Sequence, residues 1–394
     1  MMDIKNKIKQ LADKYFEETL AIRRHLHQNP ELSFQEHETA KYIASLLKKM
    51  GIKYKSGIAG NGILAFIEGK NPTKKTIALR ADIDALPVNE QNDLSYKSTN
   101  KGVMHACGHD AHTASMFGTI YILKELQDEF EGTISIIFQP AEEKLPGGAK
   151  LMIDEGVLEN PKPELIIAQH VYPELTTGKV GFKPGTYMAS ADELYFTVKG
   201  KGGHAAIPDK ITNTVLTAAQ IITRLHEIPK QTPKDVPTVL TIGKVIANGA
   251  TNVVPNEVYM EGTFRTMDET WRKIAHNKIT TIATETASSN GAQIEINIKH
   301  GYPVLINNQE TTQKAISFAQ EFLGKENIEE LHLRMTAEDF AYYSQVIPAT
   351  FYRLGTSKNL NDYSPLHSPN FNIDEDALKI GMGTMAFIAY NFIS

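Results

Sequence analysis

Two patterns of apolar and polar residues divide the chain. Over residues 1–184, short apolar runs such as GTISIIFQ and ELIIA alternate with stretches in which apolar residues recur every three or four positions. A first helix is predicted from the apolar spacing of Ile4, Ile8, Leu11, Tyr15, Ile22 and Leu26. A second is predicted from Glu36 to Met50, with Gly51 as its C-terminal cap. Strands that alternate with helices in this way predict an α/β domain around a mostly parallel, buried sheet.

The pattern changes near residue 185. DELYFTVKG alternates with a period of two, and a helical stretch follows at Thr212–Glu227. VPTVLTIGKVIA and NEVYMEGTFRTM then read as two successive strands, before a helix over Glu269–Ser289 and a last strand at QIEINIK. The order β-α-β-β-α-β is that of a ferredoxin-like α+β unit. We therefore predict a discontinuous α/β domain (residues 1–184 and 302–394) with a smaller α+β domain (residues 185–301) inserted.

Composition narrows the classes of function. The net charge of −5 argues against a nucleic-acid or anionic-membrane surface, because both need clustered Lys and Arg. The longest apolar runs are the length of strands, and the N-terminus shows no apolar secretory segment. One cysteine excludes an internal disulfide and fits a reducing compartment, so a cytoplasmic protein is expected.

The segment HACGHDAH is the strongest candidate for chemistry. It places three histidines and the chain's single cysteine within eight residues: Cys107, His109 and His112 are metal-type donors, with Asp110 beside them. Thiolate and imidazole suit zinc and related first-row metals. The alternative is that Cys107 is a small buried hydrophobic residue, as lone cysteines usually are. The density of donors favours a metal site.

A second candidate, FQPAEE, follows an apolar strand. Glu142 and Glu143 would lie at the carboxyl end of that strand, where open parallel sheets form their active sites. Two adjacent buried carboxylates repel each other unless a cation is present, so one could bind metal while the other acts as a general base. The alternative is an ordinary solvated pair of acidic residues.

Further donors follow other strands. His170 ends the run ELIIAQH, and His367 lies between two prolines in SPLHSPNF. Asp82 and Asp84 follow the strand KTIALRAD, and an aspartate is a natural orienting partner for a metal-bound histidine. Each histidine alone is more often a surface or core residue, but the fold would bring these strand ends together.

The inserted domain offers its own polar candidates. His204 follows the glycines of VKGKGGHAAIP, which would let the backbone approach a ligand closely. Asn252 lies in NVVPNEV and Arg265 in GTFRT, and an arginine can grip a carboxylate with two parallel hydrogen bonds. On spacing alone, ordinary surface polar residues are the favoured explanation for these three.

Taken together, these motifs resemble the dinuclear-metal amidohydrolases, which include aminoacylases, hippurate hydrolases, N-acetyldiaminopimelate deacetylases and indole-acetyl-amino-acid hydrolases. The wider superfamily also holds carboxypeptidases and dipeptidases. The resemblance covers nearly the whole chain through an ordered series of blocks: RRHLHQNPELSFQEHET, RADIDALPVNE, MHACGHDAH, FQPAEE, PGGAKLMI, QHVYPELTTG, VKGKGGHAAIP, NVVPNEV, TAEDFAYY and SPLHSPNF.

The resemblance implies roles for the candidate residues. It assigns Glu142 as general base, Asp84 as an orienting residue, and two divalent ions to Cys107, His109, Glu143, His170 and His367. Where the wider superfamily has carboxylates at two ligand positions, this chain has Cys107 and His170, which points to the acyl-amino-acid hydrolases. This donor set accepts Zn, Mn, Co or Ni and does not distinguish among them.

The implied reaction is hydrolysis of the amide bond of N-acyl-L-amino acids by a metal-activated water. His204, from the same chain or from a second copy, would stabilise the oxyanion, and Asn252 with Arg265 would hold the amino acid's carboxylate. The resemblance also makes the inserted domain a lid that mediates a homodimer. The implied partner is a small molecule, with no nucleic acid and no membrane.

Four alternatives remain at this point. A dipeptidase or carboxypeptidase of the same superfamily is the nearest, and a non-catalytic ligand-binding relative is more remote. A nucleotide-binding oxidoreductase would use Gly200, Gly202 and Ala205 as a loose dinucleotide fingerprint, but Pro208 interrupts the helix that should follow. A serine hydrolase is disfavoured because no G-x-S-x-G occurs.

Overall fold

The computed structural model describes residues 3–394, and the chain divides into two compact units. Of the described residues, the first unit comprises 3–185, 306–332 and 339–394, and the second comprises 186–305 and 333–338. Residues 302–305 and 333–338, which the sequence pattern assigned to the α/β domain, thus belong to the second unit. Residues 333–338 belong to the second unit because the backbone of Arg334 forms a bridge with that of Met188. No local sequence pattern signals this contact between distant segments.

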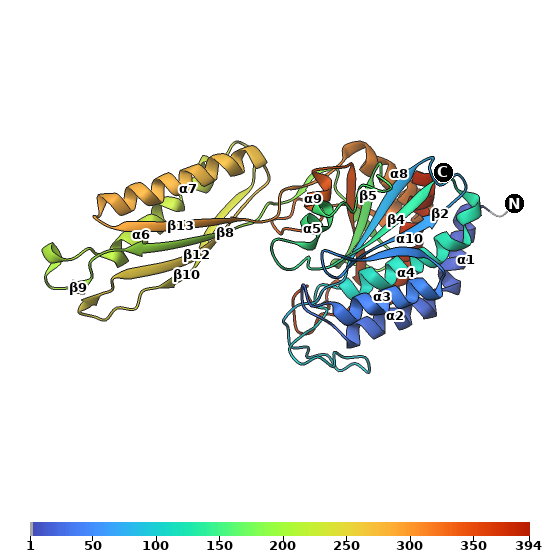
Figure 1. Cartoon of the computed structure of the whole chain (residues 1–394), viewed down its shortest axis with the longest axis horizontal. Helices are drawn as coiled ribbons and strands as arrows, with labels where there is room; N and C mark the ends of the chain where they lie inside the picture. Colours follow the sequence, from blue (N-terminus) through green and yellow to red (C-terminus); the bar gives the residue numbers. More distant parts are fainter. Residues whose placement is uncertain (1–2) are drawn as a thin grey trace. The chain divides into compact units, whose positions relative to one another are not determined.

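An eight-stranded sheet forms the centre of the first unit (Figure 1). Its strands, in spatial order, are β1 (Lys53–Ile58), β2 (Gly62–Glu68), β4 (Thr133–Gln139), β3 (Thr76–Asp82), β5 (Ile166–Thr176), β16 (Ala349–Ser357), β6 (Val180–Phe182) and β15 (Ile328–Glu330). The central strands β4, β3, β5 and β16 are parallel. The predicted α/β class with a mostly parallel sheet is confirmed.

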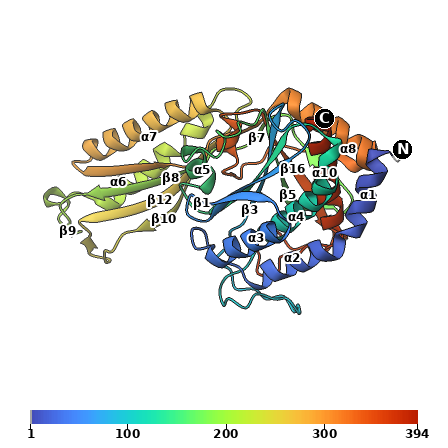
Figure 2. The same ribbon diagram turned by 45° about the vertical axis from the view of Figure 1, so that its right-hand side comes forward.

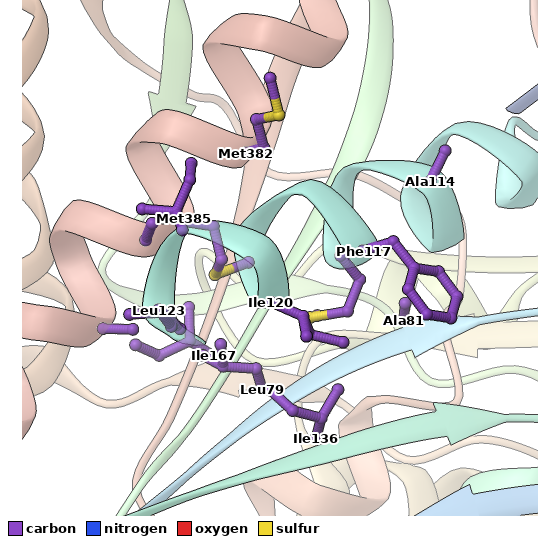
Figure 3. Packing of buried hydrophobic residues seen from close by; sticks show 14 of the residues in the cluster. Leu79, Ala81, Ala114, Phe117, Ile120, Leu123, Ile136, Ile167, Met382 and Met385 are labelled. Atoms are coloured by element: carbon purple, nitrogen blue, oxygen red, sulfur yellow. The ribbon is translucent and has the colours of Figure 1, made fainter. Parts of the chain in front are cut away.

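Helices cover the faces of this sheet. They are α1 (Ile4–Lys14), α2 (Phe16–Gln28), α3 (His37–Lys49), α4 (His109–Glu125), α5 (Gly148–Asp154), α8 (Gln309–Leu323), α9 (Ala341–Ser344) and α10 (Ala377–Ile393). Figure 3 shows α4 packed between β-strand side chains such as Leu79 and Ile136 and the methionines of α10, Met382 and Met385. Helices α1 and α2 pack on α4 and α10 (Figure 2).

Two local predictions for the first unit were wrong in detail. The N-terminal helix breaks at Tyr15, whose backbone leaves helical geometry (φ −100°, ψ 10°) while its hydroxyl donates to Glu125 and its ring stacks on Tyr121. His170 does not end its strand, because β5 continues to Thr176 by pairing with β16. Both differences occur where segments far apart in the sequence are in contact.

The second unit is an antiparallel sheet with helices on one face. Its four main strands lie in the order β10 (Thr238–Ile246), β12 (Glu257–Thr266), β8 (Asp192–Lys199) and β13 (Gln293–His300). Helices α6 (Thr214–Leu225) and α7 (Glu269–Ser289) pack on this sheet (Figure 1), and a core that includes Phe196, Met260 and Trp271 lies beneath them. Short strands β9 (Gly203–His204) and β11 (Val253–Val254) pair with each other. A last pair is β7 (Gly185–Met188) with β14 (Leu305–Asn307).

Within residues 3–394, no helix combines the length and the apolar character that crossing a membrane requires.

Candidate metal centre

The candidate ligands converge at the carboxyl edge of the parallel strands. Three groups of potential ligand atoms each lie within 4.8 Å of one another: Cys107, His109 and His170; Cys107, Glu143 and His367; and His109, Glu142 and Glu143. Parallel strands end at the same edge of a sheet, so the residues that follow β3 and β4 meet there, beside His170 within β5. All five predicted ligands and the predicted base belong to these groups.

The glycine of HACGH shapes the first part of the centre. Gly108 has φ +80°, and a Cβ built on it would lie 2.5 Å from Val171 Cγ2. Only glycine fits such a left-handed and crowded position without strain. The turn at Gly108 lets α4 begin at His109, so Cys107 and His109 face the same site from opposite sides of the turn.

A second tight turn carries the two glutamates. Ala141, which precedes Glu142, has φ +53°, an unusual value for a residue with a side chain. Its carbonyl accepts a hydrogen bond from Gly148 N–H at 3.0 Å. The Glu143 N–H donates to Asp84 Oδ2 at 3.0 Å, which links this turn to the end of β3.

Hydrogen bonds leave one nitrogen of each central histidine available. His109 Nδ1 lies 2.9 Å from the Asp84 carbonyl oxygen and 3.1 Å from Asp84 Oδ1, so Nδ1 carries the proton. His170 Nδ1 likewise faces the Val171 carbonyl oxygen at 2.8 Å. Nε2 of each ring is therefore the nitrogen that faces the centre, where His170 Nε2 lies 3.5 Å from Cys107 Sγ.

The residues present fit divalent metal. Among residues 3–394, the buried atoms His109 Nε2 and Glu143 Oε1 have no hydrogen-bond partner. Buried polar atoms normally find a partner, and exceptions mark a strained or ligand-binding site. Thiolate, imidazole and carboxylate donors at this spacing are the groups that zinc and related ions use.

The electrostatics of the centre also favour a cation. Burial raises the pKa of the Cys107 thiol well above its usual range, and the negative charges of Glu143, Glu142 and Asp82 raise it further. Burial opposes protonation of His109, yet the carboxylates of Asp82, Asp84 and Glu143 raise its pKa to about 10. A divalent ion would supply the positive charge that these carboxylates otherwise draw from protons.

Asp84 occupies the orienting position that the sequence suggested. Burial works to raise its pKa, but the hydrogen bonds from His109, Glu143 N–H and Ser33 lower it, so the group is a carboxylate. As a carboxylate it accepts the His109 Nδ1–H and fixes the direction of the ring.

Asp110 and His112 were equally good donors by spacing; His112 forms a further group of potential ligands with Asp82 and His109, but both of its ring nitrogens already have partners, and Asp110 belongs to no such group. His112 Nδ1 lies 2.5 Å from Asp82 Oδ1, and its Nε2 accepts the Val171 N–H at 2.8 Å. Asp110 Oδ2 accepts from Arg23 at 2.9 Å and contacts His27 at 2.8 Å. His112 therefore holds β5 beside the centre, and Asp110 holds α4 against α2.

Sequence reasoning missed the ion network beneath the centre. Arg80 is buried in β3 and donates to Asp82, Asp339 and Gln139 at 2.7 to 2.9 Å. Asp339 also accepts from Gln139 Nε2 and from Ala149 N–H. The network fixes the ends of β3 and β4. The available signals were an arginine inside the apolar run TIALRAD and the acidic pair in TAEDFAYY.

The structure describes the three candidates of the inserted segment within the second unit alone. His204 and Asn252 are exposed and adjacent, because Ala205 N–H donates to the Asn252 carbonyl oxygen at 2.9 Å. Arg265 lies near the opposite end of the sheet, where it donates to the Met335 carbonyl oxygen at 3.0 Å, and burial lowers its pKa. The eight residues of β8 separate these ends by roughly 25 Å.

Comparison with known proteins agrees with this centre. Residues 78–391 match the family described as "Peptidase family M20/M25/M40". The chain is 38% identical over 307 residues to an N-acyl-L-amino acid amidohydrolase of Geobacillus stearothermophilus, a match that spans 78% of this chain and 82% of that protein. It is 35% identical over 396 residues to thermostable carboxypeptidase 2 of Saccharolobus solfataricus, covering 99% of each.

A solved structure extends the likeness to the whole fold. The Bacillus subtilis YXEP protein, described as a dinuclear metal binding peptidase from the M20 family, superimposes with a TM-score of 0.82 at 34% identity. The match covers 97% of this chain and 99% of that one. The chain belongs to peptidase family M20/M25/M40, and the resemblance inferred from its motifs is confirmed.

Proposed function

We propose that this member of the M20 family hydrolyses the amide bond of N-acyl-L-amino acids, with Glu142 as general base beside two divalent metal ions. The observation that carries the proposal is the buried cluster itself. His109 Nε2 lies 3.9 Å from Glu142 Oε2 and 3.9 Å from Glu143 Oε1, and cysteine and histidine donors complete the cluster. Adjacent carboxylates among soft donors are the arrangement expected for metal-assisted hydrolysis.

Five residues would hold the metal ions: Cys107, His109, Glu143, His170 and His367. When bound, divalent ions supply Lewis-acid chemistry, because they lower the pKa of water and polarise a carbonyl group. Zn, Mn, Co and Ni all suit a donor set of one thiolate, one carboxylate and three imidazoles.

Glu142 would move the proton. It takes a proton from the attacking water and passes it to the departing amine, so one carboxylate serves as base and then as acid. Glu143, the adjacent residue, holds a ligand position, and the turn at Ala141 separates the two roles. Asp84 fixes His109 in the tautomer that the centre needs.

The second unit would contribute the substrate contacts. In this proposal His204 stabilises the developing oxyanion, while Asn252 and Arg265 hold the amino acid's carboxylate. Because roughly 25 Å of β8 separates Arg265 from His204 and Asn252 within one chain, they can reach one small substrate only if two copies cooperate. This separation supports a homodimer in which the second unit of one copy serves the centre of the other.

A carboxypeptidase is the second candidate, and a specific observation favours it. One relative that matches this chain over 99% of its length carries the name thermostable carboxypeptidase 2. Cys107 and His170, at positions where the wider superfamily has carboxylates, favour the acyl-amino-acid hydrolases instead. The two activities differ in the acyl group that is removed and share the same centre.

The test joins a substrate panel to a variant of the base. The purified protein, stripped of metal and reloaded with Zn, Mn, Co or Ni in turn, is assayed with N-acetyl-amino acids, N-benzoyl-amino acids, dipeptides and longer peptides. Glu142→Gln should lower kcat by about 1,000-fold while metal content stays at the wild-type level. Glu143→Gln, the matched control, should lower metal content itself.

Three results would contradict the proposal. Full activity after chelation would exclude the metal mechanism. Loss of metal in Glu142→Gln would make Glu142 a ligand and leave the base unassigned. Turnover of peptides in preference to every N-acyl-amino acid would establish the carboxypeptidase alternative.

A further inference from the structure

A buried carboxylate outside the ligand groups holds the turn that carries the two glutamates. Glu36 is fully buried just before α3. Its Oε1 accepts hydrogen bonds from Ala141 N–H at 2.8 Å and from Phe34 N–H at 2.9 Å, and its Oε2 accepts from Asn61 Nδ2 at 2.8 Å. One side chain thus connects three segments that lie far apart in the sequence.

Both backbone groups on Oε1 belong to residues in the left-handed region. Ala141 has φ +53° and Phe34 has φ +68°. A residue with a side chain adopts this conformation only when its surroundings hold it there. For Ala141, the holding contacts are the bond to Glu36 through its N–H and the bond from Gly148 through its carbonyl.

The conformation of Ala141 decides where the next two side chains point. Glu142 and Glu143 follow it directly, and both carboxylates approach the same nitrogen, His109 Nε2, at 3.9 Å. If Ala141 relaxed to a negative φ, the chain direction after it would change, and the two carboxylates would leave these positions.

We propose that Glu36 is a positioning residue, which holds Ala141 in the left-handed conformation and so aims Glu142 at the reacting water. This inference rests on the proposed function, since it needs Glu142 to be the base. Glu36 acts through the backbone and touches no substrate. Burial raises the pKa of Glu36, because it disfavours the charged carboxylate. An apolar side chain would fill this position at a lower free-energy cost, so the three hydrogen bonds point to a role beyond packing.

The decisive comparison is between two variants of similar volume. Glu36→Gln keeps a carbonyl oxygen that accepts the Ala141 and Phe34 N–H groups, provided that the Asn61 amide turns over. Glu36→Met fills the same space without an acceptor. We expect Glu36→Met to lower kcat on the order of 100-fold, with KM and metal content close to wild type, because a misplaced catalytic group costs about that much. Glu36→Gln should keep most of the activity.

A second pair of variants acts from the other side of the contact. Ala141→Pro removes the N–H and imposes a negative φ, so it should reproduce the kcat loss even if Glu36→Met does not fold. Ala141→Gly combined with Glu36→Met should recover roughly 10-fold of the lost kcat, because glycine adopts the left-handed conformation without strain. A general loss of stability would not be repaired by this glycine.

The matched control is Glu31→Gln. Glu31 also accepts two backbone N–H groups, from Glu38 and Thr39, but at the start of α3. It should lower thermal stability slightly and leave kcat unchanged. The inference is overturned if Glu36→Met keeps wild-type kcat, or if the glycine restores nothing. If Glu142→Gln is fully active, the proposed function fails first, and that outcome is distinct because it does not involve Glu36.

Discussion

Each unit buries a cluster of charged side chains, and the two clusters differ in how their polar atoms are satisfied. In the second unit, Asp192 accepts two hydrogen bonds from Arg272, one from His276 and one from Gly301 N–H, at 2.5 to 3.1 Å. In the metal centre, His109 Nε2 and Glu143 Oε1 have no hydrogen-bond partner among residues 3–394, although Glu143 Oε1 lies 3.3 Å from the half-exposed His367 Nε2. The Asp192 carboxylate is satisfied by protein groups alone, and we call it the complete cluster; the metal centre, which we call the open cluster, presents buried atoms that a cation would satisfy.

Burial of charge alone therefore does not mark a functional site in this protein. Asp192 is 1% exposed and Asp82 is 0% exposed, and in both the neighbouring cations lower the pKa against the effect of burial. The two regions separate only when each polar atom is assigned a partner. Single buried polar atoms without a partner, such as Trp271 Nε1 and Ser135 Oγ, occur elsewhere among the described residues; in the metal centre such atoms also lie among other potential ligands.

The largest expected effect comes from breaking the complete cluster. Arg272→Met leaves the Asp192 carboxylate buried without its main cation, and should lower the free energy of unfolding by about 3–5 kcal/mol. Glu143→Gln, in the metal-free protein, should change it by less than about 1 kcal/mol, because the ion pair that it weakens joins Glu143 to His367, whose side chain is 55% exposed. Denaturant unfolding followed by circular dichroism measures both variants, and the fluorescence of Trp271, the only tryptophan, reports on the second unit directly.

Equal losses for the two variants would contradict the comparison. Arg272→Lys is the control for charge: it keeps the cation but not the two parallel hydrogen bonds, and should fall between wild type and Arg272→Met.

A smaller effect is expected from completing the open cluster. Addition of Zn, Mn, Co or Ni at 100 times its dissociation constant should raise the free energy of unfolding of the metal-free protein by about 3 kcal/mol. Cys107→Ser should weaken this gain, and Arg272→Met should leave it intact because Arg272 belongs to the complete cluster. Thermal melts at rising metal concentration measure the shift in melting temperature. The absence of any shift with all four metals would refute the interpretation of this cluster as a metal site.

The sequence predicted the helices and strands well where the local pattern of apolar and polar residues indicates which side chains are buried. The run TISIIF lies in β4, whose residues are all buried, and the alternating DELYFTVK forms β8 with alternate buried positions. The errors arose where distant contacts decide the structure. Tyr15, where the predicted helix breaks, bonds to Glu125, and Arg334 of residues 333–338 bridges to Met188. Neither contact leaves a trace in local periodicity.

The residues of the site also fall into those that the sequence could identify and those that it could not. Residues with metal-type side chains after apolar strands were identifiable, because chemistry and position point to the same edge of the sheet. The residues that support them were not. Arg80 and Asp339 pair across 259 positions, and Glu36 reaches Ala141 across 105. Such partners follow from the fold and from the need to satisfy buried polar groups, which sequence spacing does not encode.

The smallest expected effect is a pH dependence that belongs to the Asp192 cluster. Burial opposes ionisation of Asp192, but the hydrogen bonds from Arg272 and His276 outweigh it and lower its pKa to about 2. A carboxyl whose pKa is lower in the folded than in the unfolded state stabilises the fold above the unfolded value, near 4, and loses that contribution as pH falls toward 2. The full contribution is about 2 kcal/mol.

Asp192→Asn should therefore be less stable than wild type at neutral pH, and the difference should shrink between pH 4 and pH 2. Trp271 fluorescence during acid titration, in the metal-free protein, measures this difference without interference from metal release. A difference that stays constant down to pH 2 would mean that the charge on Asp192 contributes nothing and that its shape alone matters, which would remove the electrostatic basis for separating the complete cluster from the open one.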